Sequence, residues 1–581
     1  MKKGISITVI LLFIISQVVF NQDNFIYNEN GRLYHPNGEE VALWGVNLQP
    51  MLSWEYRLLK GAGVQKDAES INRATDESLD ELELIGCRLI RCHLTPADFT
   101  DDKGNLVETV FLDALDYMVA EAAKRNIYLY ITFINHMGSG EVKNSFMQGY
   151  KKDRVKWIAD KEFVKKSKKY ITQLLNRENK YSKFQYKADS AVAVWEIINE
   201  PDYLKYDTIL SGPYAKQYKK WLKRNKLKDG KFTFFKYRQE MVLNYINEMY
   251  NVVRKTGAKQ PVSWCCNWHR MIIGHEDVFD AISQSKVEAV SFCNYPGQSV
   301  CKHPYYENPQ DLTKYNYSDW YVDCYEKEEY YGWTLKPEFQ SKAKLVYEFE
   351  TFYNQSAYLY PVMADFFRSM GVQMAAMWQY SMPAYAEYRG GSHVLNIKCT
   401  PAKAASFAVA GKIFEETSLL QPYHIESTTE WQTNKYMYSY KKNVSAFSDD
   451  NYFYHSADID NDFKLQASSS VKEIFGYGNS PLVNYTGTSN YIIKISDKEL
   501  DITIHPDVRY RRELWKLHNM DWGPVTTLDS SENRTLKLNL NNWSKGKYTL
   551  YEIKDGVRQK KGTMNELTMF LNPGHYLVVK E

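Results

Sequence analysis

The feature that most constrains the fold is a series of eight short apolar runs between residues 41 and 416. They begin at Val41, Arg88, Ile127, Ala191, Pro261, Ala289, Lys344 and Gln373. Nearly continuous apolar strands that alternate with helices are typical of a parallel sheet covered on its outer face. Eight such units in about 380 residues predict an α/β fold, a (β/α)8 TIM barrel with insertions.

The segments between these runs have the pattern of helices. Leu112, Leu115 and Val119 recur at spacings of three and four residues, and Pro401 opens a similar segment that we expect to close the barrel. Thr75 to Ser78 are expected to open the helix that leads to Gly86. The polar segments 151–187, 203–237 and 297–339 are expected to form excursions at the barrel rim, where loops shape clefts.

From about residue 425 the pattern changes to short alternating runs separated by turn residues such as Asn572-Pro573-Gly574. Such a pattern predicts an all-β, sandwich-like module. We therefore expect a signal peptide over residues 1–21, a (β/α)8 barrel over 22–424 and a C-terminal β-sandwich module over 425–581.

The first residues predict export. Lys2 and Lys3 precede an apolar stretch from Ile5 to Phe20, and a basic start before a short apolar run is typical of a signal peptide. The stretch is short for a membrane span, and no Cys follows it as in a lipoprotein. We expect a secreted or periplasmic protein with no integral membrane span after signal cleavage.

The composition limits the classes of ligand and partner that the chain could bind. The net charge of +3 argues against nucleic acid, which requires a dense basic surface. The 46 Tyr and 14 Trp residues suit flat, amphipathic ligands such as sugars, although a Tyr-rich β module would also use them. The eight Cys form no CxxC pair and there is no HExxH motif, so we expect no metal and no cofactor. Cys301 and Cys324 lie in a polar insertion, where an exported protein could carry a disulfide.

Two carboxylates end predicted barrel strands. Glu200 lies in the sequence Trp195-Glu-Ile-Ile-Asn-Glu-Pro after the fourth run, and Glu348 ends the seventh. The carboxyl ends of barrel strands form the catalytic face. Strands four and seven face each other across the barrel mouth, and two opposed carboxylates are the minimum apparatus of a glycosidase.

These residues resemble those of clan A glycoside hydrolases, in particular the family-five cellulases and mannanases and related endo-β-1,3-glucanases. The resemblance covers Val41 to Glu416. It implies that Glu200 is the acid/base and Glu348 the nucleophile. It also implies substrate-binding residues on five strand ends, namely Arg91, which holds the nucleophile, His136, Asn199, Tyr295 and Trp378.

Two positions depart from the family pattern and indicate a divergent member. Cys293 stands where family-five members usually have His, and Glu350 stands where many have Gly. Glu348 and Glu350 share strand parity, so both are expected on one face. The match to the family strand favours Glu348 as nucleophile, which leaves Glu350 as a rim carboxylate that contacts substrate or bonds a neighbour.

The sequence therefore predicts a secreted, retaining β-glycoside hydrolase that cleaves an oligo- or polysaccharide by double displacement and is endo-acting. The glycan stays open between β-1,4-glucan, mannan, β-1,3-glucan and galactan. The alternative is a non-catalytic carbohydrate-binding or surface adhesion protein on a decayed barrel. For a retaining enzyme the carboxyls of Glu200 and Glu348 are expected about 5–5.5 Å apart.

Overall fold

The computed structural model describes most of the chain after the predicted signal peptide. The described residues are 24–135, 140–150, 153–268, 270–296, 316–327, 329–350, 356–390, 393–426, 429–460, 465, 468–512, 523–543 and 546–581. The predicted signal peptide, His136 and Cys301 lie outside these residues, so the structure bears neither on the cleavage site nor on a pairing of Cys301 with Cys324.

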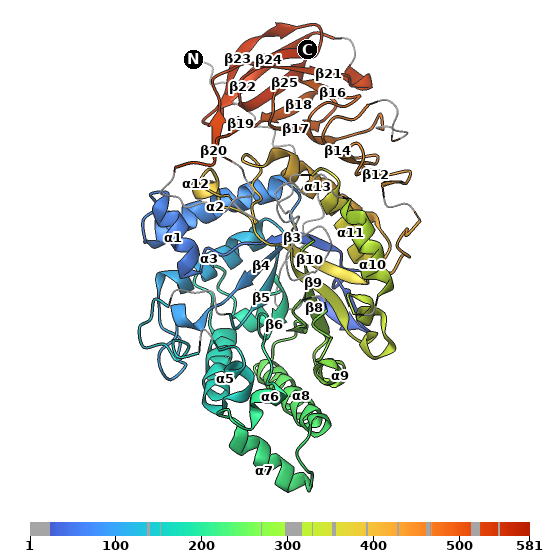
Figure 1. The fold of residues 1–581 in the computed structure, drawn as a ribbon. Coiled ribbons are helices and arrows are strands. Elements are labelled where there is room, and N and C mark those ends of the chain that lie inside the picture. The colour runs from blue at the N-terminus through green and yellow to red at the C-terminus, as the bar shows by residue number, and fades with distance from the viewer. Residues whose placement is uncertain are drawn as a thin grey trace.

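Eight parallel strands close into a barrel in chain order, with the last strand pairing with the first (Figure 1). The predicted (β/α)8 barrel is confirmed, and each predicted run contains one strand. The strands are β3 (Leu43–Asn47), β4 (Leu89–His93), β5 (Tyr128–Thr132), β6 (Val192–Glu196), β7 (Val262–Cys265), β8 (Ala289–Asn294), β9 (Ala343–Phe349) and β10 (Val372–Met377).

Helices cover the outside of the barrel, so every residue of the eight strands is buried and the runs are almost continuously apolar. The outer helices are α2 (Ala68–Leu84), α3 (Val110–Lys124), α5 (Lys161–Asn176), α8 (Lys231–Lys255), α9 (Glu276–Gln284), α10 (Tyr317–Glu326), α11 (Leu359–Ser369) and α13 (Pro401–Glu416). No helix among those described is both long and apolar enough to cross a membrane.

The helix start expected at Thr75 was wrong. Helix α2 begins at Ala68 because the Asp67 side chain accepts a hydrogen bond from the Ser70 amide and caps the helix there. Thr75 instead turns inward, and its hydroxyl bonds the Ile71 carbonyl within the helix.

Shorter elements decorate the rim and the base of the barrel. The excursion after β6 contains α6 and α7 and extends beyond the barrel outline (Figure 1). The short elements are the strands β1 (Tyr27–Glu29) and β2 (Arg32–Tyr34) and the helices α1 (Ser53–Gly61), α4 (Lys156–Ala159), α6 (Tyr206–Ile209), α7 (Ala215–Asn225) and α12 (Pro383–Ala386).

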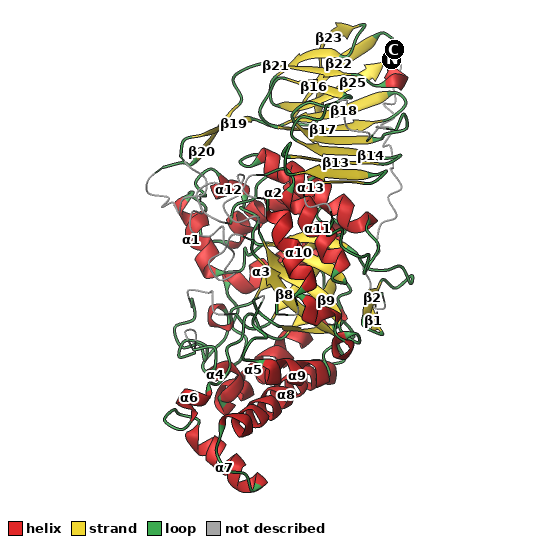
Figure 2. Ribbon diagram, turned by 45° about the vertical axis from the view of Figure 1, so that its right-hand side comes forward, coloured by secondary structure: helices red, strands yellow, loops and turns green. Residues whose placement is uncertain are grey.

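The C-terminal part is all-β, as predicted, and its sheets stack at one end of the molecule (Figure 2). The larger sheet contains β11 (Glu430–Gln432), β12 (Tyr436–Ser439), β13 (Val444–Ser448), β14 (Tyr452–Ser456), β15 (Glu473–Tyr477), β17 (Asn490–Ile495), β18 (Glu499–Ile504), β25 (Gly574–Lys580), β22 (Tyr548–Lys554) and β23 (Val557–Met564). The smaller sheets contain β16 (Val483–Tyr485), β21 (Arg534–Leu538) and β24 (Thr568–Leu571), and β19 (Asp507–Tyr510) and β20 (Thr526–Asp529). A second apolar core fills the space between the larger sheet and the β16–β21–β24 sheet.

The β module shares its other face with the barrel. Tyr454 and Phe475 of the large sheet belong to the same continuous apolar core as the barrel. Helix α13 lies between the two parts and is buried along most of its length. Polar contacts tie the surfaces together as well, because Tyr438 donates to Asp365 of α11 at 2.8 Å. The tyrosines of β12 and β14 therefore serve packing.

We predict that Phe475→Ala lowers the free energy of unfolding by about 3–5 kcal/mol. The side chain is fully buried in the shared core, so its loss leaves a cavity between the barrel and the module. Urea unfolding followed by tryptophan fluorescence measures the effect. Phe570→Ala is the matched control, because Phe570 is 72% exposed in the same module, and a change of equal size there would contradict the shared core.

Candidate active site

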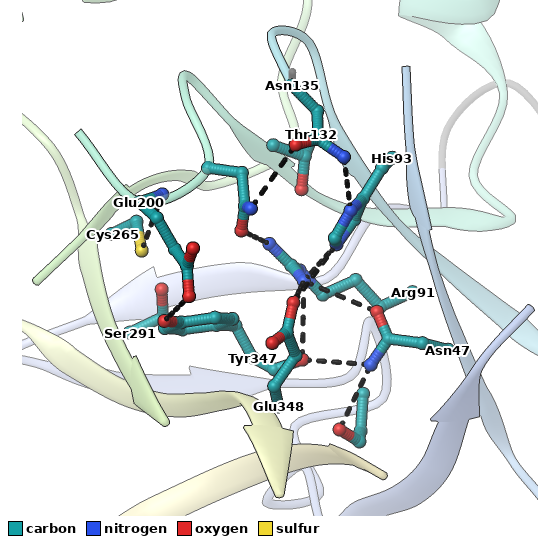
Figure 3. Close-up of polar contacts among 12 residues, drawn as sticks. Asn47, Arg91, His93, Thr132, Asn135, Glu200, Cys265, Ser291, Tyr347 and Glu348 are labelled. Carbon is teal, nitrogen blue, oxygen red and sulfur yellow. Dashed lines mark hydrogen bonds and ion pairs between the residues drawn. The ribbon is translucent and has the colours of Figure 1, made fainter. Parts of the chain in front are cut away.

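Glu200 lies just after β6 in a strained backbone conformation. Its φ is 46°, in the left-handed region that residues other than glycine rarely adopt, and Pro201 after it restricts the backbone further. Such a conformation costs about 1–3 kcal/mol and persists where the surroundings impose it. Here the Glu200 amide donates to the Cys265 sulfur at 3.4 Å. The turn directs the carboxyl toward the barrel mouth, near Tyr347 (Figure 3).

Glu348 approaches the same place from β9, which carries a bulge. Against both neighbouring strands, the register of β9 gains one extra residue between Val346 and Phe349. A bulge interrupts strand alternation, so the consecutive side chains of Tyr347 and Glu348 both point into the barrel (Figure 3). The Tyr347 hydroxyl donates to Glu200 Oε1 at 3.1 Å. Strand β9 therefore supplies one carboxyl and positions the other.

Arg91 on β4 joins the two sides of the site. Its guanidinium is fully buried and donates to Glu348 Oε1 at 3.2 Å and to Glu196 Oε2 at 2.5 Å. Arg91 thus makes the predicted contact with Glu348 and also forms an ion pair with Glu196. Burial disfavours the charged form, but the negative charges of Glu196 and Glu348 raise the pKa of Arg91 overall.

Glu196 fixes Arg91 from below and is itself fully buried. Besides Arg91, three hydroxyl groups donate to its carboxylate, from Tyr130, from Thr132 at 2.7 Å and from Ser291 at 2.7 Å. A buried ion pair is stable where hydrogen bonds satisfy the remaining lone pairs. The pair thus forms a rigid floor beneath the two mouth carboxyls.

Three other predicted residues lie at this site. Asn199 accepts a bond from Arg91 at 2.9 Å through its side-chain oxygen. The Tyr295 hydroxyl donates to Glu348 Oε2 at 2.7 Å. Trp378 follows β10 and stacks on His93, with ring centroids 5.1 Å apart. His136 lies outside the described residues, so its predicted role stays a prediction.

Glu350 is turned away from the site. Its side chain is fully buried and pairs with Lys403 of α13 at 2.7 Å, and the Tyr360 hydroxyl donates to it at 3.0 Å. Strand β9 ends at Phe349, so the alternation that would place Glu350 beside Glu348 stops before it. Of its two expected roles, bonding a neighbour agrees with these contacts, and the predicted substrate contact does not.

Sequence reasoning missed His93, Tyr347 and Arg154. His93 contacts Arg91, lies 3.4 Å from Glu348 Oε1 and bonds Asn135 (Figure 3). Its spacing of two residues from Arg91 on one strand is a signal that could have found it. Arg154 lies in a loop and donates to Glu200 Oε2 at 3.2 Å and to Asp202 at 3.1 Å. No local pattern indicates such a contact.

The two mouth carboxyls influence each other's charge. Burial raises the pKa of Glu200, while Arg154 and Tyr347 oppose the rise. Burial and the negative charge of Glu200 raise the pKa of Glu348, while Arg91 and Tyr295 oppose it. The two carboxyls are thus coupled, because a negative charge on one disfavours a negative charge on the other.

A (β/α)8 barrel with two carboxyls at its mouth, one after the fourth strand and one on the seventh, is the arrangement expected of clan A glycoside hydrolases. Comparison with known proteins finds relatives of this class. The chain is 28% identical over 179 residues to a putative mannan endo-1,4-β-mannosidase 9 of Oryza sativa, covering 30% of this chain and 40% of that protein. It is 28% identical over 178 residues to mannan endo-1,4-β-mannosidase 1 of Arabidopsis thaliana, covering 30% and 41%.

Solved structures of the same description also match. An endo-1,4-β-mannanase from Rhizomucor miehei matches with a TM-score of 0.46 at 16% identity, over 68% of this chain and all of that one. An endo-β-1,4-mannanase from Thermotoga petrophila matches with a TM-score of 0.45 at 13% identity, over 93% of this chain and 98% of that one. No protein-family model matches the chain.

The predicted resemblance to clan A glycoside hydrolases is confirmed, and the low identities agree with a divergent member. The chain spans less than half the length of these two curated relatives.

We predict that Arg91→Met lowers the free energy of unfolding by about 3–5 kcal/mol, because it leaves buried carboxylates without their cation. Loss of the cation further raises the pKa of Glu348, so the folded state then binds more protons than the unfolded chain, and stability falls as pH rises. Urea unfolding at acidic and alkaline pH should show the larger loss at alkaline pH. Arg509→Met, which breaks an exposed pair with Asp529, should change stability by less than about 1 kcal/mol.

Proposed function

We propose that the chain is a retaining β-glycoside hydrolase that cleaves β-1,4-linked mannan internally. The observation that carries the proposal is the geometry of two carboxyls, Glu200 after β6 and Glu348 on β9. Tyr347 donates to Glu200, and its neighbour Glu348 accepts hydrogen bonds from Arg91 and Tyr295. Retaining glycosidases use such a pair, with one carboxyl as acid and the other as nucleophile.

Glu348 is the proposed nucleophile. It accepts hydrogen bonds from the Arg91 guanidinium and the Tyr295 hydroxyl, and both contacts favour its ionised form. Its carboxylate attacks the anomeric carbon as the bond to the leaving oxygen breaks, and a glycosyl-enzyme forms. The cation and the hydroxyl also fix the direction from which the oxygen approaches the sugar.

Glu200 is the proposed acid/base. Its side chain is more exposed than that of Glu348, 13% against 8%, which suits a group that meets the leaving oxygen and then water. It donates its proton to the departing sugar, becomes ionised, and then takes a proton from the water that hydrolyses the glycosyl-enzyme. The second step restores the proton to Glu200 and frees Glu348.

Asn199 is proposed to bind the 2-hydroxyl of the sugar. Its side-chain oxygen is held by Arg91 at 2.9 Å, which directs the amide group, with its hydrogen-bond donors, away from the guanidinium. A donor fixed in this way strengthens its contact as charge develops at the sugar ring. Trp378, stacked on His93, is the proposed floor of the same subsite.

The choice of mannan rests on the curated relatives, whose names state endo-1,4-β-mannosidase activity. Among the glycans that the sequence left open, mannan is therefore the substrate we propose. Export is proposed from Lys2, Lys3 and the apolar stretch after them. A protein that degrades a polysaccharide outside the cell requires such a signal.

Incubation of the purified chain with a panel of β-1,4-mannan, β-1,4-glucan, β-1,3-glucan and galactan tests the proposal. We expect mannan to be cut to a range of oligosaccharides, with the β-configuration of the new reducing ends seen by proton NMR at early times. Glu348→Ala should abolish turnover and recover part of it with azide, with an inverted product. Glu200→Ala should spare substrates with good leaving groups, because these require no acid.

Lys403→Met is the matched control, because it removes the partner of Glu350 and leaves both mouth carboxyls in place. We expect this variant to be less stable and still to release product with retained anomeric configuration. Sugar binding without turnover on any glycan would favour the carbohydrate-binding alternative. Inverted configuration in the wild-type product would exclude double displacement.

Arg154→Met should move the alkaline limb of the activity profile to higher pH. Arg154 holds down the pKa of Glu200, so its loss raises that pKa and keeps the acid protonated at higher pH. The dependence of kcat/KM on pH measures the shift. Arg125→Met, which breaks a pair with Asp80 on the outer helices, should leave the profile in place, and an unmoved profile for Arg154→Met would contradict the assigned contact.

A further inference from the structure

The excursion after β6 carries a concentration of positive charge. From Ala215 to Lys236 the chain has nine Lys and Arg residues against one acidic residue, Asp229, although the whole chain has a net charge of +3. This segment comprises α7, the turn after it and the start of α8. Both views place α7 at the end of the molecule opposite the β module (Figures 1 and 2).

The charges at the tip are not neutralised by the protein. Lys226, Lys228 and Lys231 are exposed, and within the described part of the chain no carboxylate forms an ion pair with them. Asp229 accepts a hydrogen bond from the Tyr218 hydroxyl at 2.9 Å and is the one acidic residue of the turn, so positive charge remains in excess there. Three cations thus face solvent around one turn.

The same turn presents apolar side chains. Phe232 is 83% exposed and Leu227 is 40% exposed. Leu227 lies between Lys226 and Lys228, and Phe232 directly follows Lys231. Single exposed apolar side chains are common on protein surfaces, but here two of them share the segment 226–232 with three exposed lysines. Exposed apolar side chains next to exposed lysines fit an anionic lipid surface, where the apolar groups enter the acyl boundary and the lysines reach the headgroups.

The neighbouring groove is a weaker candidate. A cavity of about 580 Å³ between α5, α7 and α8 is also lined by lysines. However, Glu248 pairs with Lys168 and Glu240 pairs with Arg224 across it. Excess charge and exposed apolar groups therefore coincide at the turn between α7 and α8.

We propose that residues 226–232 dock the protein on an anionic lipid surface. Phe232 and Leu227 enter the interface, and Lys226, Lys228 and Lys231 contact the headgroup phosphates. A soluble polyanion would use the lysines but would leave Phe232 exposed, so the apolar pair favours lipid. The inference does not depend on the proposed hydrolase activity.

Sedimentation of the full chain with vesicles tests the proposal. We expect binding to vesicles of phosphatidylcholine mixed with phosphatidylglycerol, little binding to phosphatidylcholine alone, and weakening by salt. Neutralising Lys226, Lys228 and Lys231 to Gln should weaken binding by about fivefold per lysine. Phe232→Ser should weaken it severalfold at unchanged net charge.

Matched controls distinguish binding through residues 226–232 from binding caused by any exposed lysine or phenylalanine. The triple variant Lys494→Gln, Lys537→Gln, Lys560→Gln removes three exposed lysines of the β module, and Phe570→Ser removes its exposed phenylalanine. Both should bind as the wild type does, and melting curves check that every variant is folded. Absence of binding to anionic vesicles would overturn the proposal. The proposal would also be overturned, in favour of a soluble polyanion, by two results together. These are vesicle binding that Phe232→Ser leaves unchanged, and competition by dextran sulfate that is equal for this variant and the wild type.

Discussion

The buried guanidinium of Arg91 is the interaction on which the site depends. One cation meets Glu196 beneath it, Glu348 beside it and Asn199 above it, all within a barrel that excludes water. Because an unpaired charge is costly in such an environment, each of these side chains has few alternative positions. The proposed nucleophile is therefore held by the same contacts that keep the barrel interior neutral.

A second constraint links the barrel to the β module. Helix α13 has the barrel on one side and the large sheet on the other, and the apolar core continues across it. Lys403 of this helix also pairs with Glu350, just after the strand that carries Glu348. The module thus supports the helix that anchors the end of β9, which gives a structural role to residues far from the chemistry.

The sequence was most informative where a pattern is local. Eight apolar runs defined the barrel strands, and Asn199-Glu200-Pro201 marked one carboxyl, because each follows from neighbouring residues alone. The start of α2 was misplaced because the cap at Asp67 decides it. Tyr347 escaped prediction because a bulge breaks the alternation that would turn it outward. Arg154 escaped because its contact with Glu200 joins two loops distant in the chain.

The bulge in β9 also ties both carboxyls to one short segment of the chain. Tyr347 touches Glu200, and Glu348 is the next residue in the same strand. A displacement of β9 therefore carries one carboxyl and a contact of the other in the same direction. The positions of the two carboxyls are therefore linked through two consecutive residues of one strand, and a substitution that shifts the bulge would disturb both of them.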